Sequence, residues 1–185
     1  MTPAGWSLLR LNPVGLAGIG DLPAGGGSGE GVGRSSHLAV AGGALWMAAG
    51  DRLLRVSLTT GQVIATIPLP GSYSSDVAAN QGGTVLVASE ADDGGLGRVQ
   101  RRDPVTGALI ASHQMIGVAA PGIGGLIGSG VWVAEATGMM GYIERFRTVT
   151  MAPDLATEVG GTNGIDVTVA DGLAWVTEGV NPSHD

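Results

Sequence analysis

Short apolar segments that follow a turn glycine recur along the chain. Their length, their content of Val, Leu and Trp, and the turn residues that bound them are typical of β-strands. The segments are Gly43–Ala48, Gly83–Ala88, Gly130–Glu135 and Gly172–Glu178. A Trp or Leu recurs within them, at intervals of about 40–46 residues, which indicates repeated units of supersecondary structure.

Further strand-like stretches flank each of these segments. A strand-like stretch precedes each segment, such as the stretches that begin at His37 and at Asp166. A second stretch, with a central Arg, follows each of the first three segments. The stretches with the Arg are Leu53–Ser57, Val99–Asp103 and Ile143–Arg147, and the same pattern occurs near the start as Leu8–Asn12. A glycine turn and a fourth stretch come next. The repeat therefore predicts four short antiparallel strands per unit, with no amphipathic helix between them.

One four-stranded sheet cannot bury both faces alone, whereas several sheets stacked around an axis can. We therefore expect an all-β fold, a β-propeller of four-stranded antiparallel blades. Trp46, Trp132 and Trp175 lie on the second strands and are expected to be structural residues that fill the gap between adjacent blades, rather than residues that stack on a ligand.

The chain, residues 1–185, is expected to be a single propeller domain or propeller section with three full blades and two half blades. The expected parts are a half blade at 6–23, a Gly-rich loop at 24–34, full blades at 35–70, 75–114 and 119–160, and a half blade at 164–178. Two arrangements fit this division. The half blades meet and close a four-bladed ring, or the chain is a section of a six- or seven-bladed ring, which we favour.

Charge and composition exclude several classes of partner. The chain is 44% hydrophobic and 14% charged, with a net charge of −7, and all its basic residues are Arg without a basic face. Nucleic acid and anionic membrane surfaces are therefore not expected as partners. The uncharged run from Gln114 to Ala134 follows the repeat and contains Pro121, so we expect two strands there and no membrane span. Cysteine is absent, which leaves the redox compartment open, and residues 1–20 lack a signal-peptide pattern. The oligomeric state is left open as well.

Candidate chemistry lies where strands begin or end. Of the histidines His37, His113 and His184, His37 precedes an innermost strand, and Asp76 and Asp166 begin the equivalent strands of other blades. Glu135 and Glu178 end second strands. Together with His37 and the two aspartates they form a hypothetical acidic cluster at the channel mouth, with oxygen ligands suited to Mg²⁺ or Ca²⁺. The competing interpretation is that these are solvated turn residues.

Short stretches of the sequence carry two family resemblances. Trp132–Glu135 and Trp175–Glu178, with 141–146 after the first, resemble the blades of streptogramin B lyase-type propellers. The turn Arg101–Gly107 resembles the YVTN and pyrroloquinoline-quinone-type repeats of bacterial surface and periplasmic propellers. The lyase resemblance implies opening of a macrocyclic ester by elimination, with a His base and a metal held by carboxylates. The second resemblance implies a bacterial, extracytoplasmic protein.

Three functions follow from these observations. The first is a non-catalytic β-propeller binding or scaffold module, which takes a small molecule or a protein at a face of the ring. The second is a metal-assisted lyase or hydrolase that acts on a cyclic ester or lactone, with His37 as the base. The third, a fragment of a quinone-cofactor dehydrogenase, is disfavoured, because it needs many stacking aromatics and the chain has four Trp, two Tyr and one Phe.

Overall fold

The computed structural model describes residues 7–11, 18–23, 37–79, 83–117, 119–127, 129–137, 140–159 and 166–177. Every helix or strand within these ranges is a β-strand. The Gly-rich loop expected at 24–34, Glu178 and His184 lie outside the described residues.

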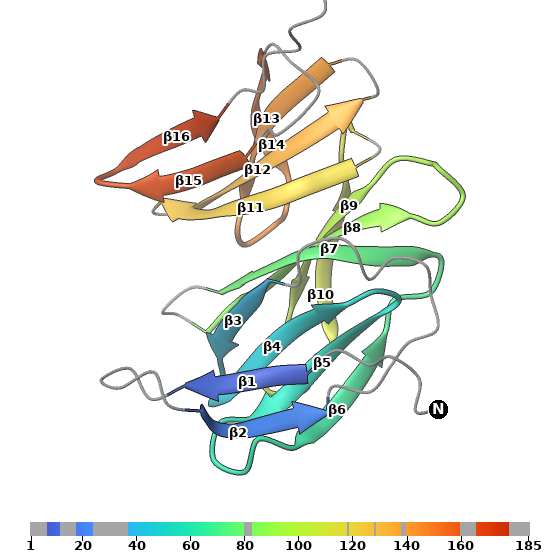
Figure 1. Ribbon diagram of the computed structural model, residues 1–185. Helices are drawn as coiled ribbons and strands as arrows, with labels where there is room; N and C mark the ends of the chain where they lie inside the picture. The colour runs from blue at the N-terminus through green and yellow to red at the C-terminus, as the bar shows by residue number, and fades with distance from the viewer. Residues whose placement is uncertain are drawn as a thin grey trace, which may run out of the picture.

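Three four-stranded antiparallel sheets form the centre of the described structure, and each runs in chain order (Figure 1). The first comprises β3 (Leu38–Ala41), β4 (Ala44–Ala49), β5 (Arg52–Ser57) and β6 (Val63–Pro68). The second comprises β7 (Ser72–Ala79), β8 (Val85–Ala91), β9 (Arg98–Arg102) and β10 (Leu109–Gln114). The third comprises β11 (Ala119–Ile127), β12 (Gly130–Thr137), β13 (Met140–Arg147) and β14 (Pro153–Val159).

Two further sheets have two strands each. They are β1 (Ser7–Leu11) with β2 (Gly18–Pro23), and β15 (Asp166–Ala170) with β16 (Leu173–Thr177). The all-β prediction and the four-stranded antiparallel units are therefore confirmed. The uncharged run from Gln114 to Ala134 forms the end of β10, β11 and part of β12, and none of the described residues forms a helix suited to crossing a bilayer.

Tight glycine turns let successive strands of one sheet pair directly. Asp171 and Gly172 connect β15 to β16 with φ of 52° and 75°. Positive φ at both central residues matches the type I′ turn, whose twist suits a two-residue hairpin and favours Asp-Gly. In this turn the glycine of the repeat is thus explained by the positive φ that its position requires.

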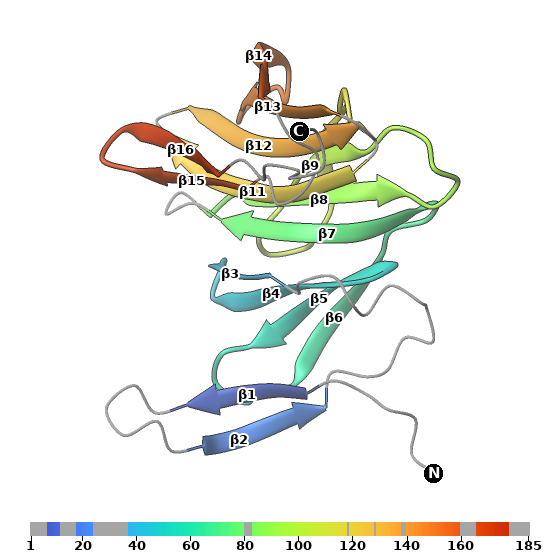
Figure 2. The same cartoon turned by 45° about the horizontal axis from the view of Figure 1, so that its top comes forward.

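The first strands of successive sheets are neighbours in space. β3 contacts β7, β7 contacts β11, and β11 contacts β15. Figures 1 and 2 show the sheets stacked face to face in this order. Such a series of sheets with their first strands adjacent is the arrangement of β-propeller blades.

Apolar cores fill the space between successive sheets. Trp46 is fully buried between the first two sheets, against Val77, Val85 and Val87, and its Nε1 donates to Ala41 O at 3.2 Å. Between the second and third sheets lie Leu86, Val99, Met115, Val133, Phe146 and Met151. Because each sheet buries one face against the next, stability depends on stacking rather than on any single sheet.

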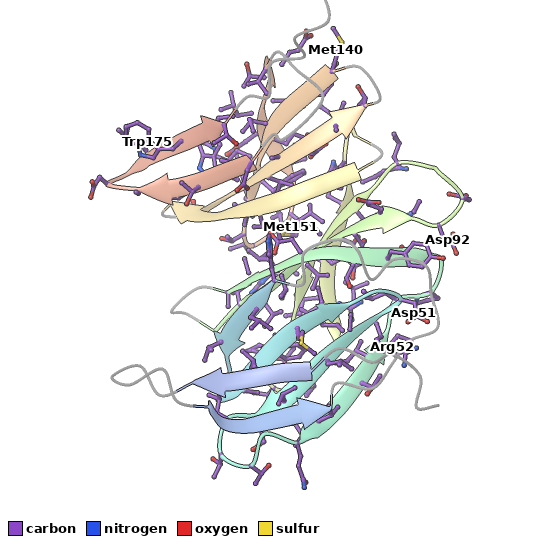
Figure 3. The ribbon with its side chains drawn as sticks, viewed as in Figure 1. Asp51, Arg52, Asp92, Met140, Met151 and Trp175 are labelled. Atoms are coloured by element: carbon purple, nitrogen blue, oxygen red, sulfur yellow. The ribbon has the colours of Figure 1, made fainter. Side chains whose placement is uncertain are left out.

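The equivalent residue of the last sheet is not buried. Trp132 is partly buried and packs against the core cluster that includes Val167 of β15, whereas Trp175 is 59% exposed. The expected blade-packing role thus has no counterpart for Trp175 in this structure, because no described sheet follows β15–β16. Figure 3 shows its side chain directed away from the other sheets.

The two half sheets lie at opposite ends of the stack (Figures 1 and 2). β1–β2 and β15–β16 are separate sheets, and no hydrogen-bonded ladder joins them. A four-bladed ring closed by these two halves, one of the two expected arrangements, is therefore not the arrangement of the described strands.

Candidate functional site at the first-strand ends

Four residues occupy equivalent places on or just before the first strands of four successive sheets. Each lies opposite the residue two positions after the Trp or Leu of the second strand. The pairs are His37 with Ala48, Asp76 with Ala88, Gly122 with Ala134, and Asp166 with Thr177. Because their strands are adjacent, these residues, which we call the first-strand set, come together across the sheets.

Asp76 connects three sheets through one carboxylate. Its Oδ1 accepts from Val77 N at 2.6 Å, and its Oδ2 accepts from Ile123 N of β11 at 2.5 Å. The same Oδ1 is paired with Nδ1 of His37, which precedes β3. Asp76 is only 2% exposed, and this burial raises its pKa, while the hydrogen bonds and His37 oppose the rise.

His37 stands at the solvent side of this arrangement. Its side chain is 42% exposed, whereas that of its partner Asp76 is 3% exposed. A buried carboxylate bonded to Nδ1 fixes the orientation and tautomer of an imidazole, and Nε2 is the ring nitrogen that Asp76 does not use. The pair is a histidine held by an acid and presented towards solvent.

Gly122 creates the room in which two carboxylates approach each other. A Cβ on this residue would lie 2.9 Å from Oδ1 of Asp166 and 3.7 Å from Oδ2 of Asp76. Oδ1 of Asp166 accepts from Val167 N at 2.8 Å, the same contact that Asp76 makes with Val77. Unlike Asp76, Asp166 is exposed. The absent side chain thus lets the carboxylates of β7 and β15 lie on either side of β11.

Glu135 belongs to a different place. It is fully buried on β12, and Glu144 of β13, which pairs with Val133 and so lies diagonally across from Glu135, is 3% exposed. Oε2 of Glu135 accepts from Gly117 N at 2.8 Å, and Oε2 of Glu144 faces Ile116 N at 3.4 Å. Burial, reinforced by the nearby Glu144, raises the pKa of Glu135 to about 8. The two acids bind the chain that leaves β10.

The expected acidic cluster is therefore only partly assembled. His37, Asp76 and Asp166 come together, whereas Glu135 pairs with Glu144, and Glu178 lies outside the described residues. Within the described ranges no group of three or more His, Asp or Glu side chains has a geometry that would hold a metal ion. The described residues do not fit the carboxylate-held metal that the lyase resemblance implies.

Sequence reasoning missed Gly122, Glu144 and the amide of Ile123. Glu144 has a sequence signal, because it is a charged residue between Ile143 and Phe146 of an apolar strand. Gly122 stands at the position that His37 and Asp76 occupy in other repeats, but the irregular pairing of β11 with β12 obscures that alignment. A backbone donor such as Ile123 N leaves no trace in a sequence.

Comparison with known proteins shows the fold. No protein-family model and no curated protein sequence matches the chain. Many solved structures are similar at low identity, and three of them illustrate the similarity. Kuenenia stuttgartiensis hydrazine synthase has a TM-score of 0.72 and 13% identity over 88% of this chain and 46% of that one. A Bacteroides caccae protein of unknown function has a TM-score of 0.67 and 14% identity, over 93% of this chain and 61% of that one. The Neurospora crassa Pan2 WD40 domain has a TM-score of 0.60 and 12% identity, over 82% of this chain and 46% of that one.

These similarities are structural. WD40 domains are β-propellers, and the match with one supports the stacking of sheets described above. The chain spans about half the length of these three solved structures, between 46% and 61% of each. Identities of 12–14% carry the fold alone, because one fold serves many functions.

Proposed function

We propose that this β-propeller is a non-catalytic module that binds a small molecule or a protein at the ends of its first strands. The observation that carries the proposal is the set of hydrogen bonds that the Asp76 carboxylate accepts. Its carboxylate is buried and takes hydrogen bonds from its own strand and from β11, besides its pairing with His37. A group so engaged holds other residues in place.

The residues around this anchor supply the binding surface. His37 and Asp166 keep exposed side chains on either side of Asp76 and Gly122. Rigid strands thus present a hydrogen-bonding imidazole and a carboxylate, which suit a polar ligand with both a donor and an acceptor.

A fragment-binding experiment by NMR tests this proposal. Small polar fragments with a donor and an acceptor are titrated into the uniformly ¹⁵N-labelled chain. We expect the amides of His37, Ile123 and Asp166 to shift together, and the response to be lost in His37→Ala. Asp51→Ala, which alters an exposed surface pair, is the matched control and should bind normally. Fragment shifts confined to other residues would contradict the proposal.

One observation favours a second candidate, a lyase or hydrolase of the type that the sequence resembles. An acid bonded to Nδ1 of a solvent-exposed histidine is the arrangement of a general base and the residue that orients it. Nε2 of His37 would then take a proton from a cyclic ester or lactone, or from water. Asp76 would hold the ring and stabilise the charged imidazolium.

Turnover separates the two candidates. The purified chain is incubated with a panel of lactones and cyclic esters, with and without added Mg²⁺. The binding module predicts no hydrolysis or elimination above the uncatalysed rate. Turnover that His37→Ala abolishes and Asp51→Ala preserves would replace the binding proposal by the enzyme.

A further inference from the structure

The last two-stranded sheet ends in an edge that has no partner among the described strands. In the complete sheets every second strand pairs on both sides, whereas among the described strands β16 pairs with β15 alone. Leu173, Trp175 and Val176 of β16 are 57%, 59% and 39% exposed. An open edge with large apolar side chains is a template for another strand.

The complete sheets show what the missing third strand provides. Each third strand places an Arg opposite the Trp or Leu of the second strand. The pairs are Trp46 with Arg55, Leu86 with Arg101, and Trp132 with Arg145. The guanidinium carbon lies 6.0 Å from the ring centre of Trp46 and 5.6 Å from that of Trp132, within the range of a cation–π contact. Trp175 occupies the same place on β16, and no third strand lies beside β16 in the part of the chain that the structure describes.

β1 has the pattern of a third strand. Leu8-Leu9-Arg10-Leu11 matches Leu53-Leu54-Arg55-Val56 of β5, and β1 is followed by β2 as β5 is followed by β6. In all four cases the pairing with the next strand shifts directly after the Arg. The shifts lie at Arg10/Leu11, Arg55/Val56, Arg101/Arg102 and Arg145/Phe146. β1–β2 is therefore the second half of a blade, as β15–β16 is the first half.

We propose that β1–β2 of a second copy of this chain adds to β16 and completes a four-stranded blade. In that blade Arg10 of the second copy lies opposite Trp175, as Arg55 lies opposite Trp46. The contact covers the apolar edge and gives Trp175 an arginine partner, as Trp46 and Trp132 have in Arg55 and Arg145. The interface is thus one more example of the pairing that already builds the complete sheets.

The arrangement of one copy favours exchange between copies. β1–β2 and β15–β16 lie at opposite ends of the stack, so the half blades of one copy are far from each other (Figures 1 and 2). Two copies related by a two-fold axis would exchange both halves at once. The three complete and two half sheets described in each copy would then give about eight blades, a number within the range of known propellers.

Solution mass tests the proposal on the unmodified chain. Sedimentation equilibrium over a range of concentrations should show a monomer–dimer equilibrium. Trp175→Ala should weaken the dimer about tenfold or more, since it removes the cation–π partner and apolar edge area. Val149→Ala, in a turn away from the edge and 68% exposed, should leave the dimer unchanged. A chain that stays monomeric at the highest concentrations overturns the proposal.

Cross-linking identifies the strands that meet, since the chain has no cysteine of its own. The register of Ala48 with Leu53 places Thr177 opposite Leu8 of the second copy. Mixing Leu8→Cys with Thr177→Cys under mild oxidation should give a disulfide-linked heterodimer. Mixing Leu8→Cys with Val149→Cys is the control and should not. Equal yields in both mixtures, or a disulfide-linked monomer from the variant carrying both changes, would contradict exchange between copies.

Discussion

Oδ2 of Asp76 accepts the backbone amide of Ile123 at 2.5 Å, which joins the first strand of one sheet to the first strand of the next. Oδ1 of the same carboxylate holds His37 from the preceding sheet. A single buried acid thus fixes three blades relative to one another. It also aims the one histidine of the described residues that precedes a first strand.

Replacing Asp76 by alanine should destabilise the fold strongly. The change leaves the amides of Val77 and Ile123 buried without their acceptor, which costs about 2–4 kcal/mol in the free energy of unfolding. Asp51→Ala, at an exposed pair with Arg52, should cost less than about 0.5 kcal/mol. Urea denaturation of the two variants measures both values, and equal losses would refute the role assigned to Asp76.

Adding a methyl group at Gly122 should push the two carboxylates apart. The new Cβ would lie 2.9 Å from Oδ1 of Asp166, closer than packed atoms allow, so the Asp166 side chain must turn away from Val167 N and Gly122→Ala should cost about 1 kcal/mol. Removing the obstructing carboxylate should recover part of the loss, so the Gly122→Ala/Asp166→Ala double variant should be more stable than the sum of the single changes predicts. Strict additivity in denaturant unfolding would show that the two residues do not meet.

The buried pair of Glu135 and Glu144 should make stability depend on pH. Glu135 has a pKa of about 8 in the folded chain against an ordinary value of 4.5, so the folded state binds this proton more tightly than the unfolded state. Its contribution to stability is complete below about pH 4.5 and is lost as the pH rises towards about 8. Between these values wild type should lose on the order of a few kcal/mol.

Glu135→Gln isolates this effect. The amide keeps an acceptor for Gly117 N and never ionises, so the variant should lack this loss while sharing the pH dependence of every other group. The measurement is the difference in unfolding free energy between the variant and wild type, taken from about pH 5 to about pH 9. A difference that does not change with pH would mean that Glu135 is ionised throughout.

The tryptophans of the repeat should differ in their contribution to stability according to the sheet that covers them. Trp46→Ala should cost about 3–5 kcal/mol, because the side chain is fully buried between two sheets. Trp175→Ala should cost less than about 1 kcal/mol when the chain is diluted to the monomer, because the ring is 59% exposed. Thermal and urea unfolding of both variants test this order, and similar losses would contradict the exposure of Trp175.

The fold could be predicted from the sequence because turns and buried strand positions each leave a local pattern, and that pattern recurs in every repeat. Glycine turns and a recurrent Trp or Leu identify strands and stacked sheets without knowledge of their partners. The sequence also placed His37, Asp76 and Asp166 at equivalent first-strand ends. It grouped Glu135 with them because strand ends are alike in a linear pattern, yet the side chain of Glu135 lies on the buried face beside Glu144.

The contacts that define the candidate site could not be predicted from the sequence. They depend on a missing side chain at Gly122 and a backbone amide at Ile123, which no residue pattern marks. The exposure of Trp175 was equally hidden, because the repeat is the same as for Trp46 and only the covering sheet differs. Pattern thus predicts which face is apolar, and the next sheet decides whether that face is buried.

The amide signal of Ile123 tests the central claim, that Asp76 joins successive first strands. In a ¹H–¹⁵N spectrum of isoleucine-labelled protein, a short bond to a carboxylate should move this amide proton well downfield. Asp76→Ala should return it upfield and leave the amide of Ile64, on β6, in place. An Ile123 signal that is unaffected by Asp76→Ala in a folded variant would contradict the account.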